Sequence, residues 1–113
     1  MRLQQWPSHF PNNEVVSIVK IHGKYCGPNW THGRAVPAAD YDLYPEVRPI
    51  DRLDRACQAH DKDCSQGGCS RKGDAALRDV ALVVSITSPS ASVRATAALI
   101  AAAMAAAGPT RSR

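Results

Sequence analysis

The sequence predicts a single, mainly α domain spanning residues 1–113, and three observations support this prediction. A chain of this length suits one domain and no more. Helix-forming segments at 51–65 and 70–88 flank Gly67 and Gly68, which favour a turn and therefore two antiparallel helices. An alanine-rich segment at about 90–107 predicts a further helix, because alanine has the highest helix propensity.

Capping and breaking residues mark where these helices begin and end. Asp51 is a plausible N-cap of the first helix, and Pro89 ends the second. Ser90 or Ser92 can cap the third, and Gly108 with Pro109 terminates it. We expect residues 110–113 to fray.

The N-terminal half of the chain shows weaker patterns. Residues 1–13 read as an irregular arm, and 14–22 fits either a strand or one face of a helix. Residues 23–49 read as a long ordered loop, and a loop of this length in a compact domain is usually functional or disordered. We place the core of the domain at 14–88. The most apolar run, 97–107, is shorter than the ~20 residues of a membrane-spanning helix.

The net charge of +4 favours partners with anionic surfaces. No run of Lys or Arg with interleaved aromatics is present, so we expect no nucleic acid and favour an acidic membrane or micelle surface. Four cysteines in a chain poor in aromatic residues indicate cross-links.

The segment 51–64 carries the residues suited to chemistry. Because residues three and four apart share a helix face, Leu53, Cys57, His60 and Cys64 form one stripe. Asp61 points about 100° away from His60 around the axis. The two neighbours can therefore act on different partners: His60 can act as a base, and Asp61 can act as a metal ligand.

The segment 24–30 supplies a candidate partner for Asp61. Gly27 and Pro28 predict a loop whose carbonyls turn inward, and calcium takes such oxygen ligands. The loop has no carboxylate of its own. Asp61 could provide one if a disulfide between Cys26 and Cys57 joined the loop to the helix.

These two segments together resemble the secreted phospholipase A2 superfamily. The residues that carry the resemblance are Tyr25-Cys26-Gly27 and, after a variable loop, Pro49-x-Asp51-x-Leu53-Asp54-x-x-Cys57-x-x-His60-Asp61. The resemblance covers about 24–80 and is nearest to the short plant, microbial and parvoviral capsid branches. It implies a phospholipase A2-like fold, with two antiparallel disulfide-linked helices, a calcium loop before them and an extra alanine-rich helix after.

The resemblance also implies an activity, calcium-dependent hydrolysis of the sn-2 ester of glycerophospholipids. It implies that the Tyr25, Gly27 and Asn29 carbonyls and the Asp61 carboxylate hold Ca²⁺, and that Cys26 pairs with Cys57. His60 would be the general base that activates a water, and the Gly27 amide would stabilise the oxyanion. No Gly-x-Ser-x-Gly elbow is present, in keeping with a mechanism without an acyl-enzyme.

The orienting partner of His60 is expected on the second helix. His60 lies seven residues before Gly67, and Asp74 lies six after Gly68. The two residues are therefore expected at about the same distance from the turn along the two antiparallel helices. Asp79 would lie about 7 Å further along, and we therefore choose Asp74. In animal members a tyrosine supports this aspartate from the position of Cys64; Tyr41 or Tyr44 could replace it. Among the pairings that four cysteines permit, we expect Cys64 to pair with Cys69.

Two other functions are weighed beside hydrolysis. Cys57, His60, Cys64 and Cys69 could instead form a small zinc site, and a phospholipase-like domain without turnover could act as a membrane binder. Trp6 and Trp30 are candidate membrane contacts.

Disulfides indicate a secreted or otherwise extracytoplasmic location. The first residues lack the apolar stretch of a signal peptide. The sequence leaves open whether the chain is a mature enzyme or a segment of a larger toxin or capsid protein.

Overall fold

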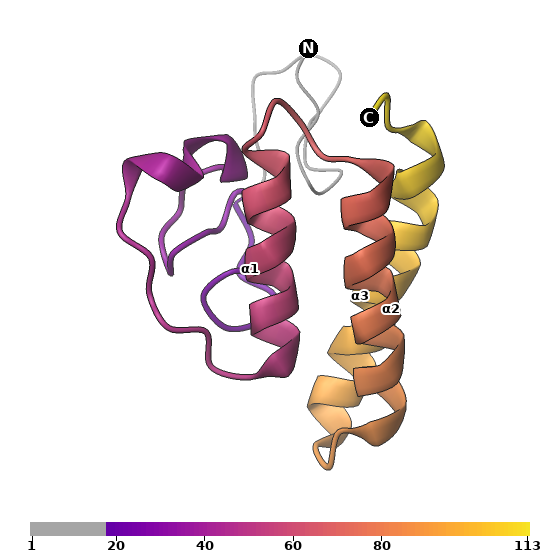
Figure 1. Cartoon of the computed structure of the whole chain (residues 1–113). Coiled ribbons are helices and arrows are strands. Elements are labelled where there is room, and N and C mark those ends of the chain that lie inside the picture. Colours follow the sequence, from indigo (N-terminus) through magenta and orange to yellow (C-terminus); the bar gives the residue numbers. More distant parts are fainter. Residues whose placement is uncertain (1–17) are drawn as a thin grey trace.

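The computed structural model describes residues 18–113, and this part of the chain is mainly helical, as predicted. Within these residues no strand is present, and only two isolated bridges occur. The chain runs through a loop with one short 3₁₀ helix, then three α-helices and a final 3₁₀ turn (Figure 1). These elements are η1 Ala38–Leu43, α1 Arg52–Cys64, α2 Arg71–Thr87, α3 Ala91–Ala107 and η2 Gly108–Thr110.

Each α-helix begins at a side-chain cap that satisfies a backbone N–H of the first turn. Asp51 accepts from the Asp54 amide, Ser70 from the Gly73 amide and Ser90 from the Val93 amide. Of the two serines considered as the N-cap of the third helix, Ser90 is therefore the one that caps it. The expected helix boundaries are confirmed to within one or two residues.

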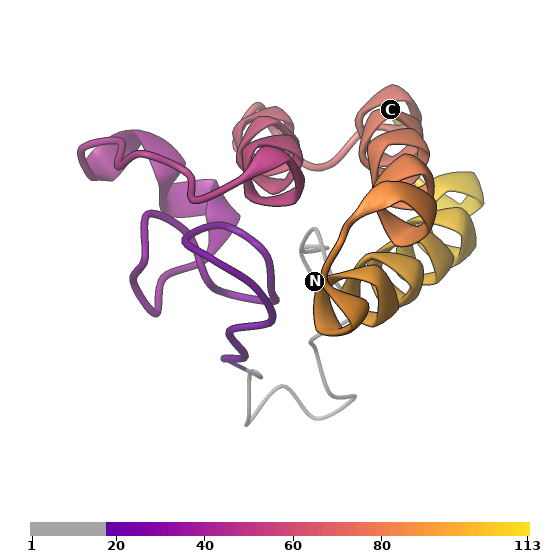
Figure 2. The same cartoon turned by 90° about the horizontal axis from the view of Figure 1, so that it is seen from below.

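The helix α2 lies between α1 and α3, and the long loop covers the opposite side of α1 (Figures 1 and 2). Leu77, Ala81 and Val84 of α2 belong to the same core as Leu53 and Cys57 of α1. The α3 side chains of this core are Ala97, Ile100, Ala101 and Met104. The small side chains let α2 and α3 approach closely, and the alanine-rich segment is therefore a packed helix.

The described residues before Gly23 do not form a regular helix or strand. Residues 18–22 instead fold back on the loop, where the Val19 amide donates to the Pro28 carbonyl at 3.0 Å. His22 forms an isolated bridge with Cys26. The predicted arm at 1–13 lies outside the described residues.

One helical segment matches a membrane-spanning helix in length and composition. This segment is Ala91–Thr110, formed by α3 and η2, and it is the one such segment among the described residues. The sequence analysis compared only the run 97–107 with the length of a membrane-spanning helix, and the helical segment extends beyond that run at both ends. One face of α3 packs on α2, and the opposite face exposes Leu99.

Candidate functional site

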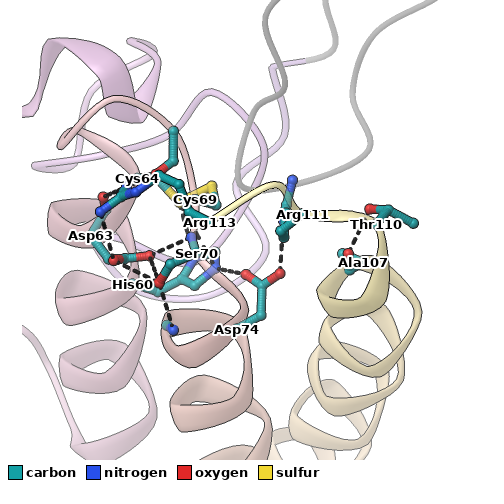
Figure 3. Close-up of polar contacts among 12 residues, drawn as sticks. His60, Asp63, Cys64, Cys69, Ser70, Asp74, Ala107, Thr110, Arg111 and Arg113 are labelled. Carbon is teal, nitrogen blue, oxygen red and sulfur yellow. Dashed lines mark hydrogen bonds and ion pairs between the residues drawn. A yellow bond between two sulfur atoms is a disulfide. The ribbon is translucent and has the colours of Figure 1, made fainter.

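The side chains of His60 and Asp74 meet inside the protein, between α1 and α2 (Figure 3). His60 Nε2 lies 2.6 Å from Asp74 Oδ1, and both side chains are 1% exposed. Asp79 points to solvent and pairs with Arg78. The prediction that Asp74, rather than Asp79, lies beside His60 is confirmed. Counting residues on either side of the glycine pair was sufficient, because the two antiparallel helices have the same rise per residue.

Asp74 has a second charged neighbour that the sequence did not indicate. Its Oδ2 lies 2.8 Å from Arg111 Nε, and this arginine is itself buried. Burial alone would raise the pKa of Asp74, but its hydrogen bonds and electrostatic interactions with His60 and Arg111 outweigh this effect and lower the pKa. Asp74 is thus a carboxylate held between an imidazole and a guanidinium.

The lowered pKa of Asp74 predicts a specific loss of stability in acid. A carboxyl group with a folded-state pKa below its unfolded value stabilises the fold above the unfolded value of 3.8. This contribution is lost as the pH falls through the folded pKa. We therefore expect the stability difference between the parent protein and Asp74→Asn, measured by urea unfolding, to narrow below about pH 4.

Asp79→Asn is the matched control, because Asp79 is on the same helix but is 66% exposed at its side chain. Its stability difference from the parent should stay small at every pH. If the difference in unfolding free energy between the parent and Asp74→Asn became larger in acid, Asp74 would not be the ionised carboxylate assigned here.

Asp61 is a buried carboxylate with a different environment. It is 0% exposed, and among the described residues neither of its oxygens has a hydrogen-bond partner. Burial raises the pKa of Asp61 well above its usual range, and the charge of Asp54 adds to this effect. Thr31 acts in the opposite direction and lowers the pKa, although the two groups do not form a hydrogen bond of ordinary geometry. A carboxyl group in such a place is costly in its ionised form, so it either stays protonated or binds a cation.

The loop predicted to hold the cation is attached to α1 beside Asp61. The disulfide between Cys26 and Cys57 joins the two, and Cys57 lies one helical turn before Asp61. In this loop the carbonyl of every second residue accepts a backbone hydrogen bond. The nominated calcium ligands, Tyr25, Gly27 and Asn29, are the residues that follow each of these acceptors. The acceptor carbonyls are Lys24 with the Gly33 amide, Cys26 with the Ile21 amide and Pro28 with the Val19 amide.

Asp54 fixes the start of this loop, a role that the sequence analysis missed. Its buried carboxylate accepts hydrogen bonds from the amides of Lys24, Tyr25 and Ile50 at 2.9–3.0 Å. Asp54 lies on the face of α1 that also carries Cys57 and Asp61. This position, one turn before a buried cysteine, was the signal that could have revealed it.

Gly27 is required by both backbone conformation and space. Its φ of 141° suits only glycine, and a Cβ there would lie 1.9 Å from the Val19 carbonyl oxygen. Asn29 has a φ of 54°, which asparagine tolerates. The nominated donors are one buried carboxylate and backbone carbonyls, and hard oxygen donors of this kind are the ones that calcium takes.

We predict that Gly27→Ala destabilises the fold by about 1–3 kcal/mol, the usual cost of forcing an extra carbon into a packed site. Gly67→Ala is the matched control, since Gly67 has a φ of 94° but nothing within 4 Å of the added carbon. Urea unfolding measures the loss of stability in each variant. The loss in Gly67→Ala reports backbone strain alone, and the additional loss in Gly27→Ala reports the clash with the Val19 carbonyl. Equal losses in the two variants would argue against the close approach of Val19.

The second disulfide packs beside His60. Cys64 pairs with Cys69, as expected, and the Cys64 sulfur lies 3.9 Å from His60 Nδ1. His60, Cys64 and Cys69 form a potential metal-binding group, with ligand atoms within 4.8 Å of one another. In the disulfide state its sulfurs are not the thiolates that bind metals, and Cys57 of the expected zinc set is paired elsewhere. The two disulfides are compatible with an extracellular location.

The two tyrosines considered as supports for Asp74 lie elsewhere. Tyr41 donates to Glu46 and accepts from Gln58, and Tyr44 lies under the guanidinium of Arg34. Neither tyrosine is therefore bonded to Asp74, and the second oxygen of this carboxylate is paired with Arg111 instead. The expectation that residues 110–113 fray was wrong, because Arg111 is buried.

Of the two candidate membrane contacts, only Trp30 lies within the described residues. It is partly buried, and its indole N–H donates to the Gly23 carbonyl at 3.1 Å. Trp6 lies outside the described residues.

Comparison of the chain with protein-family models, with curated proteins and with solved structures finds no match.

Proposed function

We propose that this chain is a calcium-dependent hydrolase that cleaves the sn-2 ester of glycerophospholipids and releases a fatty acid and a lysophospholipid. One observation carries the proposal. A buried histidine paired with a carboxylate stands next in the chain to a second buried carboxylate that lacks a partner among the described residues. A base and a cation ligand on adjacent residues suit metal-assisted ester hydrolysis. The phospholipid substrate rests on the sequence resemblance and on the net charge of +4.

His60 acts as the general base in this proposal. In the proposed tautomer Nε2–H donates a hydrogen bond to Asp74, so Nδ1 is the nitrogen that takes a proton from water. The water oxygen then bonds to the ester carbonyl carbon. When the tetrahedral intermediate collapses, the ester C–O bond breaks and His60 returns the proton to the leaving glycerol oxygen. The Gly27 amide is the candidate donor to the oxyanion.

The residues that would hold calcium are Asp61, through its carboxylate, and Tyr25, Gly27 and Asn29, through their carbonyls. When bound, the ion polarises the ester carbonyl and stabilises negative charge on its oxygen. Asp54 and the Cys26–Cys57 disulfide keep the loop beside α1, so the protein does not need to order these groups during the reaction.

The test is release of fatty acid from vesicles that mix zwitterionic and anionic phospholipids, with millimolar calcium or with a chelator. We expect release only with calcium, and the free acid should come from the sn-2 position. No release at millimolar calcium would refute the enzyme. Vesicle binding without release would favour the non-catalytic membrane binder.

A further inference from the structure

Arg111 is a buried cation that reaches the candidate site from a remote part of the chain. It is separated from Asp74 by 37 residues, yet its Nε lies 2.8 Å from Asp74 Oδ2. The other oxygen of the same carboxylate lies 2.6 Å from His60 Nε2. Asp74 therefore bridges the imidazole and the guanidinium, with one oxygen for each (Figure 3).

The path of α3 explains how Arg111 arrives there. The helix runs back alongside α2, and η2 then turns the chain towards the first turn of α2 (Figure 1). Arg71 holds the following residues through two bonds, from its Nε to the Arg111 carbonyl at 3.0 Å and from its amide to the Arg113 carbonyl at 2.9 Å. Arg113 in turn donates to the Gly68 carbonyl in the α1–α2 turn.

These bonds attach the segment 108–113 without the help of the Arg111 side chain. A buried ion pair is in general a weak source of stability, because desolvation opposes the attraction between its charges. What the guanidinium adds is specific to Asp74: it fixes the plane of the carboxylate and favours its ionised form. A carboxylate in that state holds the imidazole proton on Nε2 and leaves Nδ1 as the base.

We propose that Arg111 is a positioning residue for the hydrolysis proposed above, acting on His60 through Asp74. The inference rests on that proposed function for its effect on rate. Its effect on the imidazole can be measured without substrate or calcium.

The decisive variants are Arg111→Met and Arg111→Gln, which both remove the charge, and Arg111→Lys, which keeps it. Arg111→Gln retains an N–H donor and serves if the methionine variant does not fold. Arg113→Met is the matched control, because it removes a cation from the same segment that contacts Asp63 and backbone carbonyls rather than Asp74. Both bonds from Arg71 to this segment go to backbone carbonyls, so they remain in this variant.

Two readouts are needed. Nitrogen NMR of the imidazole reports which ring nitrogen of His60 carries the proton, and vesicle kinetics separate kcat from KM. We expect the uncharged variants to lose the predominance of the Nε2–H form and to lower kcat by about 10–100-fold. KM should change less than kcat, and Arg111→Lys should recover part of both losses. Arg113→Met should resemble the parent.

The inference fails if the uncharged, folded variants keep the parent's imidazole spectrum and match Arg113→Met in kcat. An inactive parent protein would refute the proposed hydrolysis instead, while the imidazole spectra would still decide whether Arg111 orients His60. The two failures are therefore distinguishable.

Discussion

Replacing His60 by glutamine is expected to abolish calcium-dependent fatty-acid release while leaving the fold intact. Loss of a general base typically lowers the rate by about 10²–10⁴-fold. The glutamine amide can still donate to Asp74, so the buried carboxylate keeps a hydrogen-bond donor in place of the imidazole. Release from mixed phospholipid vesicles measures the effect, and circular dichroism measures the fold.

The chain offers a matched control for this substitution in a second histidine–aspartate pair. His22 Nε2 lies 2.7 Å from Asp51 Oδ2, but this pair is at the surface and far along the chain from Asp61. His22→Gln should therefore retain most of the parent activity. A folded His60→Gln protein with undiminished release would exclude His60 as the base.

Replacing Asp61 by asparagine is expected to have opposite effects with and without calcium. Without the ion, the parent buries an unpartnered carboxylate, and the neutral amide should relieve about 1–3 kcal/mol of that cost. With calcium, the parent should gain stability by mass action, about 2.7 kcal/mol at a hundredfold excess over the dissociation constant. The variant should not gain this stability. Thermal unfolding with chelator and with millimolar calcium measures both effects.

Asp54→Asn separates this behaviour from the general effect of altering a buried carboxylate. Asp54 accepts three backbone amides, so its replacement should destabilise the protein under both conditions. If calcium leaves the unfolding temperature of the parent unchanged, Asp61 is not a calcium ligand. A variant at Asp61 that is less stable than the parent in chelator would show that the carboxylate has a partner.

The positions of the helices could be predicted from the sequence because their signals are local. Caps act over two or three residues, and Asp51, Ser70 and Ser90 each satisfy an amide in the first turn of their own helix. The pairing of Cys64 with Cys69 is local as well, with a sequence separation of only 5. At 14–22 the apolar residues fit both a strand and one face of a helix, so their periodicity could not distinguish the two.

The residues proposed to carry the chemistry of the candidate site could be nominated from the sequence alone. His60 and Asp61 are neighbours on one helix, so helix geometry alone directs them to different groups. Asp74 followed from the equal rise of two antiparallel helices about one turn, and the structure places it against His60. Each of these relations depends only on spacing along the chain.

The groups that surround those residues depend on tertiary contacts and could not be predicted from the sequence. Asp54 reaches the loop across 30 residues, and Arg111 reaches Asp74 across 37. Contacts of this range depend on how α3 packs against α2 and on where the following turn ends, and no periodic pattern records them. The segment 110–113 is short and polar, so it resembles a solvated end of the chain. Burial of Arg111 is favourable only because the fold brings a buried carboxylate to meet its charge.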